Sequence, residues 1–373
     1  MNRPGRLEPF ALERYFARYE FSARYVLCPS DPESMPVNEL LAFEPDAAQR
    51  LAQLRLGYVE SRGTPELRAA IAALYAHRDG ERVLVHAGSE EPIFAFMHAA
   101  LEAGDHIVVQ FPAYQSHYSI AESIGASVTR WDSDIDGEGA PDVASLERLL
   151  RPNTRAIVVT TPNNPTGYSL SRAEFDSIVE LARSRGVWLF CDEVYRGTER
   201  EAERLPAACD VYERGVSLGG TAKAYGLAGL RIGWVSTSQS SLLERMAAIK
   251  DYLTICNSVP SEFLAALALR HGDDLTERVR QICGRNLALL DEFFARRSDL
   301  FRWKRPRAGT TAFPRYLGSN GSEAFCRRAV EEAGVLLLPS TAFDAGDAHF
   351  RIGYGRAGLP EALAALEAFI ERG

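Results

Sequence analysis

The chain has 373 residues, of which 46% are hydrophobic, so it can bury a large core and form one large domain with a smaller one. A net charge of −8, without a long run of like charges, argues against a nucleic-acid partner and favours a small molecule. Because the sequence lacks both a stretch of about 18 apolar residues and the apolar core of a signal peptide, we expect no membrane partner and a cytoplasmic location.

The cysteine and lysine contents bear on chemistry. Six cysteines are scattered without a CxxC pair or a Cys/His cluster, so we expect reduced thiols, no disulfide framework and no metal site. Of the 42 basic residues only three are lysines, at positions 223, 250 and 304. Lysine can lose its proton and arginine cannot, so each lysine is a candidate for a chemical role.

The predicted elements start with a helix in TPELRAAIAALYAHR (64–78). Thr64 is a candidate N-cap, Pro65 suits the first helical position, and apolar residues recur at 67, 71, 74 and 75. Short apolar runs follow, separated by helical patterns, at 83–86, 106–110, 156–160, 187–191, 215–218 and 232–236. Such runs are typical of strands in a parallel sheet that helices cover on both faces, and they predict an α/β fold.

The pattern changes after residue 240, where long helical segments dominate before strand and helix mix again. A candidate strand lies in AHFRIGY (348–354), and a closing helix lies in PEALAALEAFIERG (360–373). We therefore expect a large α/β domain over residues 45–270. We expect residues 1–44 and 271–373 to form a small α+β domain.

Unusual residues follow the carboxyl ends of the first predicted strands, which is where open α/β sheets bind ligands. After 83–86, Gly88 and Ser89 precede a helix whose free N–H groups suit a phosphate, although any strand-to-helix turn favours the same residues. After 156–160, TPNNPTG holds more amides than a turn needs, so we expect Asn164 to face a ligand.

Two later strand ends hold ionisable residues. Asp192 follows the apolar run 187–191, and a buried carboxylate there needs a cationic partner, unless it caps a helix. Tyr195 is three positions further on and offers its hydroxyl to the same ligand. The stretch GGTAKAYGLAGLRIGW (219–234) places Lys223 among small residues, eight positions before Arg231. These surroundings are expected to lower the pKa of the lysine and leave more free amine to attack a carbonyl.

Together these strand ends supply an anion cradle, an amide, a carboxylate, a phenol, an amine and a second cation. This set matches one kind of ligand, an aldehyde-bearing phosphate ester with a pyridine ring. Four motifs, in order from LGYVESRGTPELRAAIA (56–72) to FRIGYGR (350–356), resemble the class I/II aminotransferases, fold-type I enzymes that depend on pyridoxal 5′-phosphate (PLP). The resemblance implies the aspartate aminotransferase-like fold, with a mostly parallel sheet covered by helices and a smaller α+β domain. It also implies a homodimer with shared active sites.

The resemblance implies roles for the catalytic residues. Lys223 would form the internal aldimine and then move the proton between substrate Cα and cofactor C4′. Asp192 would keep the pyridine nitrogen protonated, so that the ring remains an electron sink. Tyr195 and Asn164 would hydrogen-bond the phenolic oxygen of the cofactor, and Asn164 would also border the substrate.

Further binding residues follow from the same resemblance. Tyr114, in FPAYQSHY, matches the aromatic residue that stacks on the cofactor ring. Arg351 matches the arginine that forks onto the substrate α-carboxylate. The implied phosphate ligands are Arg231, the backbone amides of Ser89 and Glu90, and Tyr58 of the other subunit.

Two segments depart from the usual pattern. Family members commonly have serines in an SxSK motif, where this chain has Gly220 and Ala222, so we expect Thr221 or Ser217 to supply a missing phosphate contact. The N-terminal stretch 6–41 resembles the capreomycidine-synthase-like branch, in which a related scaffold cyclises a hydroxylated arginine.

The motifs together predict an aminotransferase that moves the amino group of a small L-amino acid to a 2-oxo acid. The same residues also serve elimination, replacement or cyclisation, and acidic residues in Asp31 to Asn38 suit a basic substrate unless that segment is simply a solvated loop. A catalytically inactive regulator is disfavoured because no basic helix-turn-helix segment is present. A nicotinamide-dependent dehydrogenase is disfavoured because no GxGxxG motif follows a strand. We interpret His86, His106 and His117 as packed or solvent-facing side chains.

Overall fold

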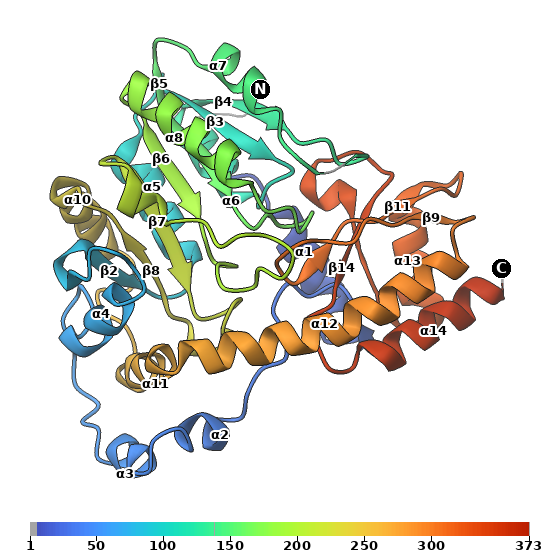
Figure 1. The fold of residues 1–373 in the computed structure, drawn as a ribbon, viewed down its shortest axis with the longest axis horizontal. Coiled ribbons are helices and arrows are strands. Elements are labelled where there is room, and N and C mark those ends of the chain that lie inside the picture. Colours follow the sequence, from blue (N-terminus) through green and yellow to red (C-terminus); the bar gives the residue numbers. More distant parts are fainter. Residues whose placement is uncertain (1–5, 138, 373) are drawn as a thin grey trace.

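The computed structural model describes residues 6–137 and 139–372, and its centre is a mostly parallel sheet (Figure 1). Within these residues the sheet has seven strands, in the order β2-β8-β7-β6-β5-β3-β4. Their bounds are β2 (Val83–His86), β3 (His106–Phe111), β4 (Ser127–Asp132), β5 (Thr154–Thr160), β6 (Trp188–Asp192), β7 (Gly215–Gly220) and β8 (Gly233–Ser236). Only β8 runs antiparallel to its neighbours, β2 and β7, so the predicted mostly parallel sheet is confirmed.

Burial explains which strands the sequence reveals. The six predicted strands are buried along nearly their whole length, as the continuous apolar runs require. The sequence analysis missed β4, which lies at the sheet edge and buries only Trp131 of its six residues. Because the remaining residues face solvent at least in part, this strand has a polar sequence that does not resemble a buried strand.

Helices cover both faces of the sheet. On one face α5 (Glu90–Ala100), α6 (Ser116–Ile124) and α10 (Ser240–Lys250) enclose a core that includes Phe96, Phe190 and Met246. On the other face lie α7 (Val143–Leu149), α8 (Arg172–Arg185) and α9 (Ala208–Val211). Near β2, α4 (Pro65–Ala72) packs on α11 (Val259–Arg270). The Thr64 hydroxyl caps α4 and Pro65 is its first residue, as predicted.

The C-terminal part has a separate core, reached along the helix α12 (Gly272–Arg296), which crosses the lower part of Figure 1. Its other elements are β1 (Tyr25–Val26), β9 (Phe301–Arg302), β10 (Thr311–Ala312), β11 (Arg315–Tyr316), α13 (Gly321–Ala333), β12 (Val335–Leu336), β13 (Leu338–Pro339), η3 (Ser340–Phe343), β14 (Phe350–Gly353) and α14 (Leu359–Glu371). The N-terminal strand β1 pairs with β12, so both ends of the chain contribute to this unit. The helix α1 (Ala11–Tyr19) lies against η3.

The segment between the two units holds the short helices α2 (Val37–Leu41) and α3 (Ala47–Ala52), while the short elements η1 (Gly80–Arg82) and η2 (Ala228–Leu230) lie in the large unit, before β2 and before β8. Leu40 of α2 packs with Leu264 and Leu267 of α11, which belongs to the large unit. The segment therefore leaves the small unit before residue 44. The domain limits 1–44, 45–270 and 271–373 remain a prediction.

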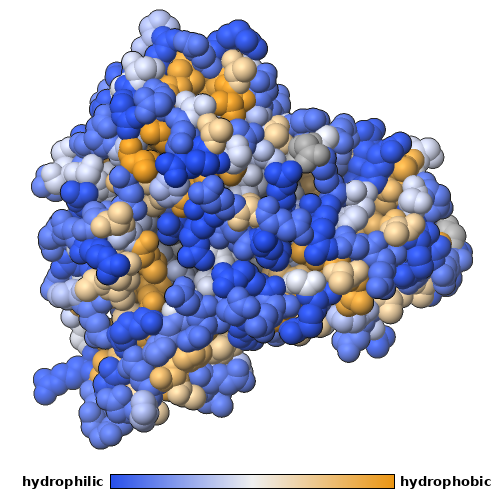
Figure 2. Space-filling view, viewed as in Figure 1, coloured by the Kyte–Doolittle hydropathy of each residue, from blue (hydrophilic) through white to orange (hydrophobic). Residues whose placement is uncertain are grey.

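The surface and the thiols complete the description. Across the described ranges, none of the helices combines the length and the apolar character needed to cross a membrane. On the face in Figure 2 hydrophilic residues predominate and hydrophobic ones lie in separate groups. Each of the six cysteines, all within the described ranges, is unpaired.

Candidate active site

A cavity of about 290 Å³ lies at the carboxyl ends of the central strands, bordered by α1, by the segment after β1 and by β14. The structure brings nine of the predicted site residues to its wall: Ser89, Glu90, Tyr114, Asn164, Asp192, Tyr195, Lys223, Arg231 and Arg351. They come from loops, strands and helix starts that are up to 262 positions apart in the sequence, from Ser89 to Arg351. Parallel strands explain this convergence, because their carboxyl ends share one edge of the sheet.

Lys223 projects into the cavity from the turn after β7. Its Nζ donates a hydrogen bond to Ser30 Oγ at 2.8 Å. The pKa of the amine is lowered to about 8, mainly because burial disfavours the charged form, and Arg351 and Arg231 act in the same direction. The carboxylates of Asp31 and Asp192 act in the opposite direction and raise the pKa of the amine. The predicted decrease in pKa is confirmed, with burial as its main cause. With this pKa roughly a tenth of the amine is unprotonated at pH 7.

Asp192 is the last residue of β6 and is only 6% exposed. Its Oδ2 lies 3.2 Å from Nε2 of His117, a fully buried residue of α6, and its Oδ1 accepts a hydrogen bond from the backbone N–H of Val194 at 3.2 Å. The carboxylate therefore has a basic partner and does not cap a helix. His117 was interpreted from the sequence as a packed or solvent-facing side chain, and only the fold shows that α6 carries it to Asp192.

Arg351 belongs to β14, and its side chain lines the cavity. Its Nε donates to the carbonyl oxygen of Cys28 at 2.9 Å, and its Nη1 donates to Oδ1 of Asn164 at 3.3 Å. The side chain is 1% exposed and its guanidinium lies 5.6 to 5.8 Å from the ring centres of Phe343 and Phe16. These contacts fix the orientation of a cation that has no carboxylate partner among the described residues. Such a group suits a carboxylate ligand.

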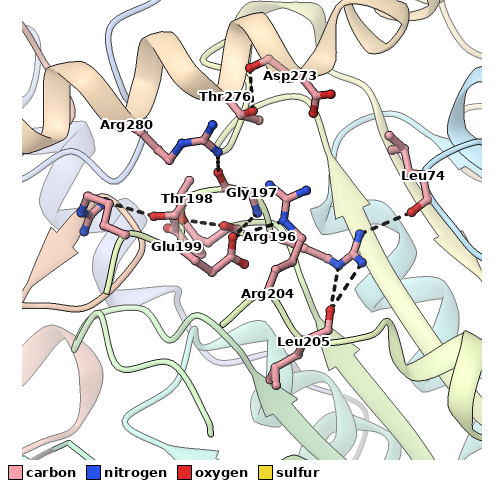
Figure 3. A network of polar contacts seen from close by, with 12 residues as sticks. Leu74, Arg196, Gly197, Thr198, Glu199, Arg204, Leu205, Asp273, Thr276 and Arg280 are labelled. Atoms are coloured by element: carbon pink, nitrogen blue, oxygen red, sulfur yellow. Dashed lines mark hydrogen bonds and ion pairs between the residues drawn. The ribbon is translucent and has the colours of Figure 1, made fainter. Parts of the chain in front are cut away.

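Tyr195 places a buried hydroxyl at the cavity, close to the Ser30 side chain but without a hydrogen bond of normal geometry among the described residues. Its pKa is raised, chiefly by burial. The loop that follows is held by the network in Figure 3. Arg280 of α12 donates to the carbonyl of Gly197 at 2.7 Å, Thr198 Oγ1 donates to the carbonyl of Tyr195 at 2.5 Å, and Arg196 donates to carbonyls in two further segments at 3.4 Å. The loop after Tyr195 is thus attached to α12 and to two further segments of the chain.

A cradle suited to an anion forms between the start of α5 and the loop before β8. Gly88 has φ +79°, and a Cβ there would lie 2.4 Å from Nη2 of Arg231, so glycine is needed both for the turn and for the approach of the guanidinium. Ser89 precedes the first residue of α5 and is directed toward β7. A Cβ at Gly220 would lie 2.2 Å from Ser89 Oγ. The Ser89 hydroxyl therefore occupies the space that the usual serine would take.

The hydroxyls proposed as substitutes for that serine lie elsewhere. Thr221 Oγ1 donates to the carbonyl oxygens of Leu227 and Ile232, and it does not border the cavity. Ser217 Oγ donates to Oε1 of Glu193 at 2.8 Å. Neither hydroxyl faces the cradle, because both stabilise the fold around β7. Tyr58 is 92% exposed and lies outside the cavity of its own chain.

The N-terminal segment contributes residues that sequence reasoning missed. Ser30, Glu13, Phe16 and Glu20 line the cavity, together with Asp31, the one residue of the segment 31–38 that borders it. The α1 helix is attached beside Tyr114, since the backbone N–H of Ala11 donates to Gln115 Oε1 at 2.8 Å and the Tyr114 hydroxyl donates to Glu13 Oε1 at 3.3 Å. The carboxylates in RLEPFALERYFARYE were the available signal, but nothing local indicated that they would meet the strand ends.

A helix-covered parallel sheet with a lysine of lowered pKa, a carboxylate and an arginine at its strand ends defines a fold-type I PLP-dependent enzyme. A model of the aminotransferase class I and II family matches residues 26–367. The chain belongs to this family. Its similarity to capreomycidine synthase of Streptomyces vinaceus is 32% identity, covering 96% of this chain and 92% of that protein.

Two solved structures resemble the whole chain. A PLP-dependent aminotransferase from Streptococcus suis superposes with a TM-score of 0.92 at 31% identity, covering 98% of each chain. The PLP-dependent cyclase OrfR superposes with a TM-score of 0.91 at 31% identity, covering 100% of this chain and 99% of the other. The family and these neighbours establish the aspartate aminotransferase-like fold and the cofactor, PLP.

The residues present fit this cofactor. The buried Tyr195 hydroxyl at the cavity would donate to an oxygen of the cofactor, and the approach of Arg231 to Gly88 would provide a cradle for its phosphate. Asp192 would supply a carboxylate for a protonated ring nitrogen, and Lys223 would supply an amine for the aldehyde. When bound, PLP provides an electron sink that stabilises negative charge at the substrate α-carbon.

Proposed function

We propose that the chain is an aminotransferase that transfers the amino group of an L-amino acid to a 2-oxo acid, with Lys223 as the catalytic base. The observation that carries the proposal is the Lys223 amine, whose pKa is lowered to about 8 in a cavity that also presents Arg351 and Asp192. In this assignment Arg351 binds the α-carboxylate, which places the α-carbon near the amine. Asp192, supported by His117, holds a proton on the ring nitrogen.

A panel of amino acids tests the reaction. The cofactor-loaded protein is mixed with one amino acid at a time, and mass spectrometry follows both the cofactor and the organic product in a single turnover. Transamination converts PLP stoichiometrically into pyridoxamine phosphate and yields a 2-oxo acid. Absence of any turnover across a panel that includes arginine and its hydroxylated forms would contradict the proposal.

A second candidate is elimination or cyclisation of a basic amino acid. It is favoured by the similarity to capreomycidine synthase and to the cyclase OrfR, each over nearly the entire chain. The catalytic groups named above serve this chemistry equally, since it also begins with removal of the α proton. In the same panel cyclisation would give a changed amino acid, elimination would give a 2-oxo acid with release of ammonia, and in both cases the cofactor would remain PLP.

The carboxylates of the N-terminal segment, on and after α1, support a cationic substrate side chain for either reaction. Asp31 is paired with Arg356, whose Nη2 lies 2.7 Å from its Oδ2. Glu13 and Glu20 also line the cavity, and within the described residues neither forms an ion pair. Burial raises the pKa of Glu20, while the positive charge of Arg356 acts in the opposite direction. A guanidinium or ammonium group of the substrate would add a further cation for these carboxylates.

Neutralising these glutamates is expected to weaken binding of basic amino acids selectively. In the double variant Glu13→Gln, Glu20→Gln, KM for arginine should rise about tenfold, because a charge-assisted hydrogen bond is lost, while KM for leucine stays within about twofold. Steady-state kinetics with both amino acids measures the effect, and Glu39→Gln, on the exposed side of α2, is the matched control. An equal change for arginine and leucine would count against a cationic side chain.

We propose that the enzyme is a cytoplasmic homodimer in which Tyr58 serves the neighbouring site. Two loops expose large apolar side chains: Leu56, Tyr58, Tyr252, Leu253 and Ile255. Lys250 ties these loops together, because its Nζ donates to the carbonyls of Ser61 and Ile255 at 2.9 and 3.2 Å. Burying such a patch against a second copy would stabilise both. Sedimentation equilibrium should give twice the mass of one chain, and a monomer at micromolar concentration would refute the dimer.

A further inference from the structure

The Lys223 amine has a neighbour that the function described so far does not use. Among the described residues its one hydrogen-bond partner is the hydroxyl of Ser30, at 2.8 Å, and both side chains line the cavity. The residues usually found as serines beside the lysine are Gly220 and Ala222 in this chain. The hydroxyl next to the amine therefore comes from the N-terminal segment, 193 residues earlier in the sequence.

The segment that carries Ser30 is fixed to the wall that holds Arg351. Thr310 Oγ1 donates to the carbonyl of Ser30 at 2.6 Å, and the preceding Cys28 carbonyl accepts from Arg351 Nε at 2.9 Å. The two backbones also touch, because a Cβ at Gly353 would lie 2.0 Å from the carbonyl oxygen of Pro29. The segment of Ser30 is thus held beside the strand that carries Arg351, while the Ser30 hydroxyl meets the Lys223 amine. A substrate held by Arg351 would bring its α-carbon to this place.

We propose that Ser30 is a positioning residue for Lys223: its hydroxyl accepts a hydrogen bond from the protonated amine and directs the amine toward the substrate α-carbon. This inference rests on the proposed function of Lys223 as base. When the nitrogen takes up the α proton, its lone pair forms the new N–H bond, and the electron pair of the broken Cα–H bond remains at the α-carbon, where bound PLP would stabilise it. The resulting ammonium then has an acceptor already in place at Ser30 Oγ. Without that acceptor the ammonium is less stable and the free amine has no fixed direction.

The test measures the Lys223 amine directly in the cofactor-free protein. Labelling with acetic anhydride across pH 6 to 10, followed by mass spectrometry of the Lys223 peptide, yields the pKa of the amine, with the Lys304 peptide as an internal reference. In Ser30→Ala the pKa should fall by about half a unit, because an acceptor of the charged form has been removed. In the cofactor-loaded protein kcat should fall about tenfold, with KM changed less than twofold.

An isosteric pair of variants separates the hydroxyl from packing. Ser30→Thr keeps the hydroxyl and should retain the native pKa and kcat, whereas Ser30→Val should behave as Ser30→Ala does. Ser34→Ala, an exposed change in the same segment, is the control for effects on the segment itself. A merely structural role would lower thermal stability and leave the pKa of Lys223 unchanged. Equal pKa values in the native, Thr and Val proteins would overturn the proposal.

A failure of the proposed role of Ser30 can be distinguished from a failure of the proposed function of Lys223. Hydride reduction of the PLP-loaded protein, followed by peptide mapping, shows whether Lys223 bonds the cofactor. If it does not, the proposed function fails, yet the acetylation experiment still answers whether Ser30 sets the pKa of the amine. If Lys223 is labelled and the pKa is the same with and without the hydroxyl, only the role of Ser30 is refuted.

Discussion

Replacing Lys223 by arginine should reduce turnover of the best substrate by about ten-thousandfold or more. The guanidinium keeps the positive charge and much of the length, but it does not release its proton and forms no Schiff base with an aldehyde. The same variant should lose the peptide label at residue 223 after hydride reduction. Single-turnover kinetics and peptide mapping measure the two effects on one preparation.

Two companions make this result specific. Lys304→Arg makes the same exchange outside the cavity and should keep native turnover. Lys223→Ala should regain part of its activity in the presence of small alkylamines, because a free amine can enter the vacated space and accept the α proton. Native turnover in Lys223→Arg would remove the base from the mechanism and, with it, the proposed function.

Replacing Asp192 by asparagine should lower kcat/KM by about a hundredfold or more. The amide is nearly isosteric, but it carries no charge to hold a proton on the ring nitrogen, so the ring withdraws electrons less effectively. His117→Asn should have a smaller effect, about tenfold, because His117 acts on the carboxylate from 3.2 Å and does not border the cavity. Steady-state kinetics of both variants measures the difference.

A cofactor analogue provides the control for Asp192. PLP methylated at the ring nitrogen carries a permanent positive charge and needs no carboxylate to keep a proton. When Asp192→Asn is reconstituted with this analogue, its kcat/KM should approach that of the native protein with the same analogue. A variant that remains about a hundredfold impaired with the analogue would show that Asp192 acts by another route, such as the placement of the loop to Tyr195.

Local pattern was sufficient for the large sheet and for most of its site residues. Runs such as AIVVT (156–160) are buried on both faces, so their composition reveals a strand without knowledge of its neighbours. Residues at the carboxyl ends of such strands, such as Asp192 at the end of β6, reach the shared edge. The edge strand Ser127–Asp132 was missed for the converse reason, because one buried residue in six leaves little apolar signal.

The sequence by itself determined the sheet, the strand-end residues and the presence of a lysine suited to carbonyl chemistry, because each of these is written in a short contiguous stretch. Only the tertiary structure decided that His117 supports Asp192, that the Ser89 hydroxyl fills the space beside Gly220, and that Ser30 meets Lys223. These contacts join segments separated by as many as 193 residues. They depend on how α1, β14 and the sheet pack together, and no local preference of the chain encodes that packing.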